Sequence, residues 1–250
     1  MHEPLHLLAL LAAGTAAGFI NILAGGGSLL TMPLLIFFGL PDVTANGTIR
    51  VGILLQNAAA FWRYRKAGVV DGGLASKLLP PGLLGAAMGA LLASHLDDSG
   101  FRVLLSGVML ICAVLVVINP IRADDNAPSQ LKLTPLRVWA VLLVAGFYGG
   151  LIQAGVGYLF LAGFTFVLGF DLVKANVWKV IIVGSYTPIA LGVFVFNGKV
   201  DWVYGGVLAV GQMLGATLGA SQALKRGAGL IRVFLVVAVV ASATKLFGLW

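Results

Sequence analysis

The chain has 250 residues, of which 60% are hydrophobic and 10% are charged, and its mean hydropathy is +1.02. Soluble domains carry about 25% charged residues, so this composition excludes a water-exposed globular surface and makes lipid the main solvent. The net charge of +7 is scattered over short loops, which indicates a membrane-topology signal and argues against a nucleic-acid partner.

Apolar stretches follow one another along the chain, and several reach the roughly 20 residues with which a helix crosses a bilayer. No Lys or Arg precedes the first stretch (Met1 to Pro4), so the basic start of a cleaved signal peptide is missing and we expect this segment in the mature protein. The single cysteine, Cys112, excludes a disulfide framework. The stretches lie at 5–23, 28–40, 44–62, 73–95, 101–119, 136–152, 156–170, 176–196, 202–222 and 230–249.

Two of the shorter stretches adjoin glycine-rich breaks. The first break is Ala24-Gly25-Gly26-Gly27-Ser28 and the second is Gln153-Ala154-Gly155-Val156-Gly157. Each glycine weakens a helix by about 1 kcal/mol relative to alanine. A helix that restarts after such a break presents unpaired N–H groups and about half a positive charge, which attract anions. Ser28 or Thr31 would cap the first restarted helix. The alternative is that the glycines only permit close packing.

The two halves of the chain match at one unbroken shift, the spacing between Gly25 and Gly155 (155 − 25 = 130). Chance pairing of Gly and Ala is the alternative, but the matched Asn, Asp and Arg residues favour a duplication. We therefore divide the chain into a first membrane repeat (1–118), a polar linker (119–135) and a second membrane repeat (136–250). The other matched positions include Gly39/Gly169, Asn46/Asn176, Gly68/Gly198, Asp71/Asp201 and Arg102/Arg232.

A second glycine pattern, Gly85 and Gly89 with the matched pair Gly215 and Gly219, has the small-xxx-small spacing of closely packed membrane helices. For these four residues we predict a packing role.

The distribution of Lys and Arg favours two repeats of opposite orientation. If each broken segment enters and returns, each half makes an odd number of crossings, and both termini lie outside. Arg102, Lys199 and Lys245 are then the main positive residues of the outer face. If the broken segment crosses once, the charge bias largely disappears. The residues that the first arrangement places near the inner face are Arg63, Arg65, Lys66, Arg122, Lys132, Arg137, Lys174, Lys179, Lys225 and Arg226.

Polar residues follow each break inside a predicted helix. The first half has Asn46-Gly47-Thr48-Ile49-Arg50 and then Gln56-Asn57; the second has Asn176 to Lys179 and then Tyr186-Thr187-Pro188. A charge at the bilayer centre costs about 2.5–3.5 kcal/mol, so it usually faces the protein interior. Spacings of four and seven positions place Asn46, Arg50 and Asn57 on one face. We predict a polar stripe that faces the glycine break, unless Arg50 and Lys179 reach the membrane surface and Asn46 caps its own helix.

The acidic residues and histidines all lie near predicted helix ends or loops, which leaves no buried chain of carboxylates or histidines for a proton relay. No catalytic dyad, metal-ligand set or nucleotide loop is recognisable, so we expect neither an enzyme nor a cofactor. Asp71 and Asp201 are at matched positions, where a helix-start role explains them as well as coupling does.

The run AGFINILAGGGSLLTMPLLIFFGLPDVTANGTIRVGILLQN (Ala17 to Asn57) resembles the first half of the TauE/SafE family of sulfite exporters and anion permeases. AGFYGGLIQAGVGYLFL and GFDLVKANVWKVIIV resemble the start of its second half, and GKVDWVYGG and GATLGA the later part. The resemblance covers nearly the whole chain. It implies an all-α, multi-pass permease of the bacterial inner membrane, with inverted repeats that each consist of a Gly-broken segment and three transmembrane helices.

Family substrates are sulfite, sulfonates and related organosulfur anions, usually for export. We therefore expect a small anion and the lipid bilayer as partners, with a homo-oligomer left open. A transporter of another small solute, or a non-transporting accessory or scaffold protein, is the alternative. Pro33 also belongs to the family motif, and Gln153 stands where a Gly is more usual. The expected substrate-binding residues are Asn21, Gly25, Gly26, Gly27, Ser28, Asn46, Thr48, Arg50, Gln56, Asn57, Gly155, Gly157, Asn176 and Lys179.

Overall fold

The computed structural model describes residues 3–70, 72–105, 107 and 134–246, with side chains described as far as Lys225, and throughout these ranges the regular structure is helical. The all-α prediction is confirmed. The expected linker, except for residues 134–135, and most of the stretch 101–119 lie outside the described residues. The helices are α1 (Pro4–Ala24), α2 (Ser28–Phe37), α3 (Asp42–Lys66), α4 (Ala75–His95), α6 (Pro135–Leu151), α7 (Val156–Ala162), α8 (Leu172–Phe196) and α9 (Trp202–Leu246), with a 3₁₀ turn at Gly72–Leu74 and a π-helical turn at Gly163–Val167.

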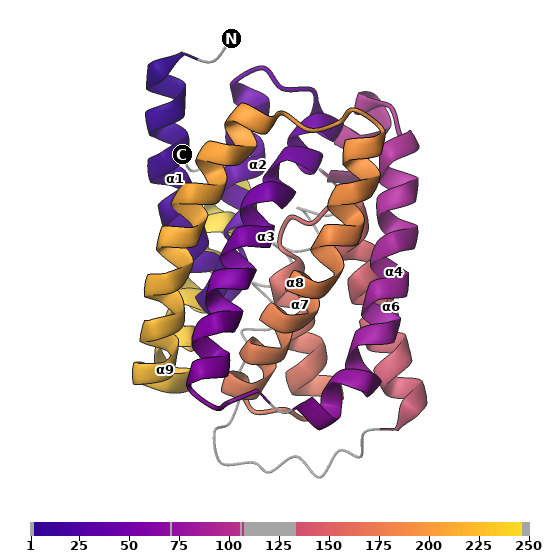
Figure 1. Cartoon of the computed structure of the whole chain (residues 1–250), viewed down its shortest axis with the longest axis vertical. Coiled ribbons are helices and arrows are strands. Elements are labelled where there is room, and N and C mark those ends of the chain that lie inside the picture. Colours follow the sequence, from indigo (N-terminus) through magenta and orange to yellow (C-terminus); the bar gives the residue numbers. More distant parts are fainter. Residues whose placement is uncertain (1–2, 71, 106, 108–133, 247–250) are drawn as a thin grey trace.

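The long helices run side by side along the longest axis of the molecule (Figure 1). In the described part of the chain, four of them are long and apolar enough to cross a membrane: Pro4–Leu23, α4, α8 and Trp202–Lys225. Phe37 and Phe196 are among the large apolar side chains that point outward, with 83% and 93% of their surface exposed. Such an outer surface suits hydrocarbon, because it needs no polar partner there.

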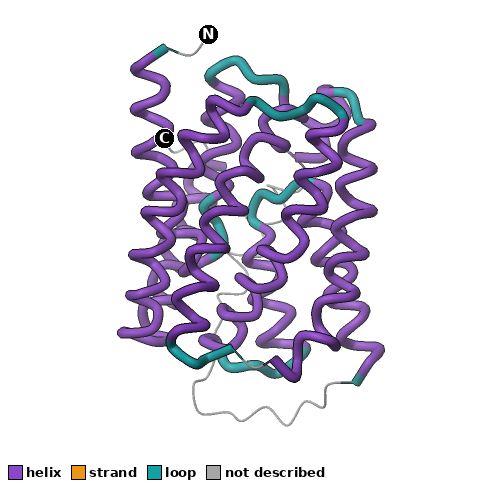
Figure 2. Tube along the Cα trace, in the orientation of Figure 1, coloured by secondary structure: helices purple, strands orange, loops and turns teal. Residues whose placement is uncertain are grey.

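Both predicted breaks are confirmed. Helix α1 ends at Gly25, which has a left-handed φ of 84° and donates its N–H to Asn21 O at 2.9 Å. Helix α6 ends before a turn in which Gln153 (φ 64°) and Gly155 (φ 71°) are left-handed. The turns that join α1 to α2 and α6 to α7 lie near the mid-height of the molecule, between the long helices (Figure 2). The chain therefore reverses inside the helical bundle.

The capping prediction for α2 is wrong. Its N-cap is Gly27, with no side-chain cap. Ser28 instead bonds across to the second break, and the Thr31 hydroxyl is buried without a hydrogen-bond partner. The hydroxyl of Ser28 bonds to the second break and not to its own helix, because the two breaks lie directly against each other.

Backbone geometry recurs at the same spacing along the sequence. Helix α8 begins and ends 130 residues after α3 begins and ends (42 + 130 = 172; 66 + 130 = 196). The left-handed glycines of the described chain form three pairs at the same spacing: Gly25/Gly155, Gly39/Gly169 and Gly68/Gly198. At these positions a side chain would be strained, so the same turn geometry explains the same residue in both halves.

Close helix packing accounts for the small-xxx-small glycines, as predicted. A β-carbon on Gly85 would lie 2.7 Å from the backbone N of Phe147 on α6, and one on Gly219 would lie 3.0 Å from the carbonyl oxygen of Phe19 on α1. Gly89 and Gly215 meet the same two helices, α6 and α1 respectively. Helix α4 thus packs along α6, and α9 packs along α1.

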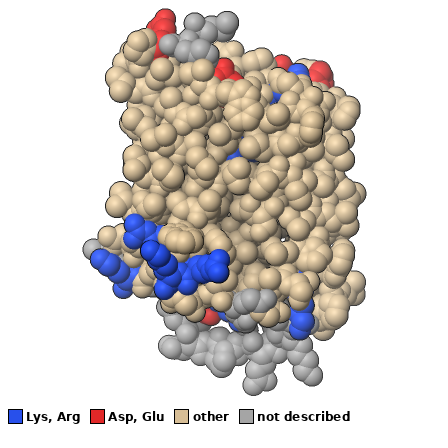
Figure 3. All heavy atoms as spheres, in the orientation of Figure 1, with Lys and Arg blue, Asp and Glu red and all other residues tan. Residues whose placement is uncertain are grey.

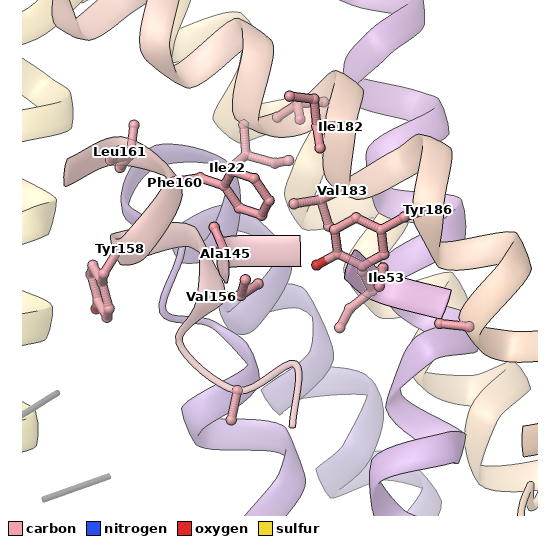
Figure 4. Packing of buried hydrophobic residues seen from close by; sticks show 14 of the residues in the cluster. Ile22, Ile53, Ala145, Val156, Tyr158, Phe160, Leu161, Ile182, Val183 and Tyr186 are labelled. Carbon is pink, nitrogen blue, oxygen red and sulfur yellow. The ribbon is translucent and has the colours of Figure 1, made fainter. Parts of the chain in front are cut away.

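Helices α3 and α8 lie against each other and carry the largest buried side chains, including Trp178, Arg50 and Tyr186. Figure 4 shows Ile53, Tyr186 and Val156 converging from α3, α8 and α7 beside the second break. Phe160 stacks on Tyr186 with ring centres 6.3 Å apart. Buried apolar side chains of α3 and α8 thus pack directly beside the breaks.

Replacing Gly215 with leucine should destabilise the α1–α9 contact, because a side chain there meets the backbone of Thr15 and Phe19. Overpacking of this kind costs about 1–3 kcal/mol, and we expect a melting temperature several degrees lower in detergent. Gly206→Leu is the matched control on the same helix, since a β-carbon there meets nothing within 4 Å. Equal melting temperatures for the two variants would contradict the packing role.

Candidate functional site

Helix α3 carries a buried arginine that bonds to the broken end of α6. The guanidinium of Arg50 donates from Nη1 to Gly149 O (3.1 Å) and from Nη2 to Gly150 O (2.5 Å). Asn46, one turn earlier on α3, donates from Nδ2 to Leu151 O at 2.8 Å. Arg50 has no exposed surface, and its guanidinium carbon lies 4.7 Å from the centre of the Phe194 ring.

Helix α8 carries a buried lysine in a corresponding arrangement with α1. The ammonium group of Lys179 donates to Asn21 O (3.0 Å), Ile22 O (3.1 Å) and the side-chain oxygen of Asn176 (2.6 Å). Asn176 in turn donates to the hydroxyl of Tyr64 at 3.2 Å. Lys179 is only 3% exposed.

The acceptors have a common origin. The last four carbonyl groups of any helix lack a partner within the helix, and they form the negative end of its dipole. A helix that ends in the membrane interior cannot turn these carbonyls to water. Arg50 and Asn46 satisfy three of them at the end of α6. At the end of α1, Lys179 satisfies Ile22 O and is a second donor to Asn21 O, which also accepts the N–H of Gly25. Each cation thus belongs to the long helix of one half and stabilises the broken helix of the other.

The two breaks touch each other at glycines. A β-carbon on Gly157 would lie 2.7 Å from the carbonyl oxygen of Gly25, so neither position has room for a side chain. Ser28 fastens the contact: its hydroxyl donates to Gln153 O and accepts from the N–H of Gly155, both at 3.3 Å.

A small cavity lies where the breaks meet. Its volume is about 10 Å³, which is room for roughly one water. The described conformation is therefore nearly closed around this point. The walls come from both halves: Asn21, Ser28, Asn57, Gln153, Val156, Gly157, Lys179 and Val183.

Most of the expected binding residues meet at or beside this cavity. Asn21, Ser28, Asn57, Gly157 and Lys179 line it directly. Asn46, Arg50, Asn176, Gly25 and Gly155 form the surrounding layer through the contacts described above. The burial of Arg50 and Lys179 rules out the alternative in which their side chains reach the membrane surface. Asn46 bonds to α6, which rules out a capping role on its own helix.

Four expected residues have other surroundings. The hydroxyl of Thr48 accepts the N–H of Asp201 at 2.9 Å, so Thr48 fixes the loop before α9 and does not face the breaks. Gln56 is buried with its side-chain oxygen unpartnered, away from the cavity wall. Gly26 packs against the Tyr158 ring, and Gly27 against the backbone of Ala17. Both glycines act here through close packing.

Sequence reasoning omitted Gln153 and Tyr186 from the binding set. The side-chain oxygen of Gln153 accepts from Arg50 Nη1 (3.3 Å) and from the Tyr186 hydroxyl (3.1 Å). Gln153 adopts a positive φ that non-glycine residues rarely take. The available signal was a polar residue, Gln153, inside a predicted break at a position where a glycine is more usual.

Comparison with known proteins identifies the family of this chain. The family described as "Sulfite exporter TauE/SafE" matches residues 10–246. The chain belongs to the TauE/SafE family. No solved structure gives a significant match to it.

Relatives of this TauE/SafE protein are named as membrane transporters. A "Probable membrane transporter protein ORF9" of Sinorhizobium sp is 33% identical, covering 96% of this chain and 92% of the relative. A "Probable membrane transporter protein" of Haemophilus influenzae is 31% identical over 92% and 91% of the two chains. The "Probable membrane transporter protein YfcA" of Escherichia coli K12 is 28% identical over 98% and 91%. The protein is thus a multi-pass membrane protein of a transporter family.

Arg50→Met should destabilise this TauE/SafE protein, because it leaves the carbonyls of Gly149 and Gly150 without donors. Each buried unpaired group costs about 1–3 kcal/mol. We expect a lower melting temperature for Arg50→Met. Arg50→Lys should recover part of this loss, because it keeps the positive charge but lacks the two guanidinium nitrogens that bond to both carbonyls. Arg63→Met, on the exposed end of the same helix, is the control and should be neutral. An Arg50→Met variant as stable as the parent would show that the Arg50 hydrogen bonds contribute nothing to stability.

Proposed function

We propose that this TauE/SafE protein transports a small anion, such as sulfite, a sulfonate or a related organosulfur anion, and binds it where the two helix breaks meet. The observation that carries the proposal is the pair of buried cations beside the breaks. Their hydrogen-bond acceptors are backbone carbonyls and side-chain amide oxygens, all of them neutral.

Buried charge without a counter-charge is costly in a medium of low dielectric constant. Among the described residues, the buried carboxylate is Asp42, and it is paired with Arg102 at 2.7 Å at the far end of α3. The potential at the breaks therefore favours an anion. Lys179 faces the cavity directly, and Asn57, Ser28 and Asn21 offer neutral hydrogen-bonding groups around it.

Transport requires the site to open, because the cavity of about 10 Å³ is smaller than an oxyanion. Ser28 and the glycine contact hold the breaks together in this conformation. In our proposal, movement of one break relative to the other admits the anion, which replaces part of the hydrogen bonding of Lys179.

The proposed architecture is a pair of inverted repeats, 1–118 and 136–250, joined by the polar linker. It is supported by the recurrence of helix bounds and left-handed glycines at one constant shift between the halves. In discontinuous-helix transporters, breaks at corresponding positions of inverted repeats mark the substrate site.

The distribution of charged side chains favours one orientation of the protein in the membrane. Lys and Arg gather at the end of the molecule where α3 ends, and acidic side chains are concentrated at the opposite end (Figure 3). By the positive-inside rule we propose that the end with Arg63, Arg65 and Lys66 faces the cytoplasm. An inside-negative potential then favours outward movement of an anion by about 2.3 kcal/mol per charge per 100 mV. Export follows from this arrangement without a proton relay.

Two alternatives make different predictions. A carrier of a neutral or cationic solute would gain nothing from the buried cations. An accessory or scaffold protein would need Lys179 only for folding, and flux of every anion tested would equal that of protein-free vesicles.

The inverted arrangement predicts that Ala67→Cys and Asn197→Cys, at matched positions (67 + 130 = 197), lie on opposite faces. Both residues are exposed at helix ends. With Cys112 replaced by serine, a membrane-impermeant maleimide should label the Asn197→Cys variant in intact cells and the Ala67→Cys variant only after permeabilisation. Labelling of both from one side would contradict the inversion.

Lys179→Gln should reduce anion flux at least tenfold, because it removes the positive charge that faces the cavity while keeping a hydrogen-bond donor. The measurement is counterflow of sulfite and simple sulfonates in proteoliposomes, with folding checked by size-exclusion chromatography. Lys174→Gln, at an exposed position near the start of α8, is the matched control. Undiminished flux through the Lys179 variant would remove the lysine from the proposed site.

A further inference from the structure

A second, larger cavity, partly open to the outside of the helical bundle, adjoins the central one. Its volume is about 430 Å³, within the range of about 300–1,000 Å³ typical of small-molecule sites. It lies between α3, α4 and α8. Its large apolar side chains include Leu54 and Phe61 of α3, Leu79 of α4, and Trp178 and Ile181 of α8.

Asn57 separates the two cavities, since it lines both of them. The backbone of α8 comes close at this point: a β-carbon on Gly184 would lie 3.1 Å from Cβ of Asn57. The Asn57 amide donates to Ile53 O at 2.7 Å within its own helix. Only this one residue is shared between the linings of the large cavity and the Lys179 site.

The wall of the large cavity is a poor environment for a bare oxyanion. Ser185, one of its few polar residues, donates its hydroxyl to Ile181 O of its own helix at 2.8 Å. Apart from Ser185 and Asn57, the lining side chains are hydrocarbon and aromatic. An ion that loses its hydration without new partners pays a large desolvation cost. A hydrocarbon group, by contrast, is stabilised there in proportion to the apolar surface it buries.

We propose that the large cavity binds the hydrocarbon part of an organic anion whose charged group sits beyond Asn57, next to Lys179. This inference rests on the proposed transport function and narrows it. The substrate is then a sulfonate or carboxylate with an apolar body, bound with its head in the polar cavity and its body between α3, α4 and α8. Inorganic sulfite has no group that uses the large cavity.

The test compares sulfite with a homologous series of straight-chain sulfonates, from methanesulfonate to butanesulfonate. The half-saturation concentration for counterflow is measured in phosphatidylcholine proteoliposomes, with protein-free vesicles as blank. Each buried methylene should lower this concentration about fourfold, or roughly 60-fold across the three added methylenes. A flat series, or sulfite as the best substrate, would overturn the inference while leaving anion transport intact.

A substitution that fills the large cavity provides a second test, with a matched control. Ala58→Phe places a ring in the large cavity, and Ala140→Phe makes the same change on an exposed position of α6. We expect the former to abolish the chain-length dependence, and the latter to behave like the parent. The unmodified protein alone decides the question if Ala58→Phe does not fold.

Other outcomes separate the two proposals. If butanesulfonate binds but is not carried, the cavity is a lipid-like or inhibitory site and the inference fails. If no anion of the panel moves faster than in protein-free vesicles, the proposed function itself fails. A chain-length dependence that survives in Ala58→Phe would place the hydrocarbon elsewhere.

Discussion

The structure depends on how carbonyl groups are satisfied where two helices end inside the membrane. Helices α1 and α6 stop in the interior, where most of their last carbonyls have no partner within the helix. Water is the usual partner of such groups at a protein surface, and hydrocarbon cannot replace it. Arg50 with Asn46, and Lys179, supply donors that are long enough to reach across from a neighbouring helix. Two cations in the core thus contribute donors that help to stabilise the breaks.

This solution has an electrostatic consequence. The cations satisfy dipoles, which carry partial charges, so part of the positive potential remains uncompensated at the point where the breaks meet. In our proposal, the donors that satisfy the backbone at the breaks thus also form a site that favours anions. The two sides are not equivalent: Arg50 forks to two carbonyls and to Gln153, whereas Lys179 also faces the central cavity. We assign the main structural role to Arg50 and the main ligand role to Lys179 for this reason.

The close contact between Gly25 and Gly157 links this electrostatic arrangement to motion. Because neither position has room for a side chain, the backbones of the two turns lie in direct contact. Ser28 adds two long hydrogen bonds of 3.3 Å. The long helices α3 and α8, in contrast, are packed by large buried side chains. In our proposal, this contact between the two turns is the part that opens when an anion enters.

Composition, hydrophobic run lengths and glycine positions were enough to predict an all-helical membrane protein, both breaks, and the polar residues that would be buried beside them. These are local properties: a charge in an apolar run must face protein, and a left-handed turn favours glycine. Tertiary structure alone decided which partner each residue meets. Thr48 and Arg50 are two positions apart on α3, yet one fixes the loop before α9 and the other holds the end of α6. Helical spacing places a residue on a face, but only the packing of distant helices determines what that face meets.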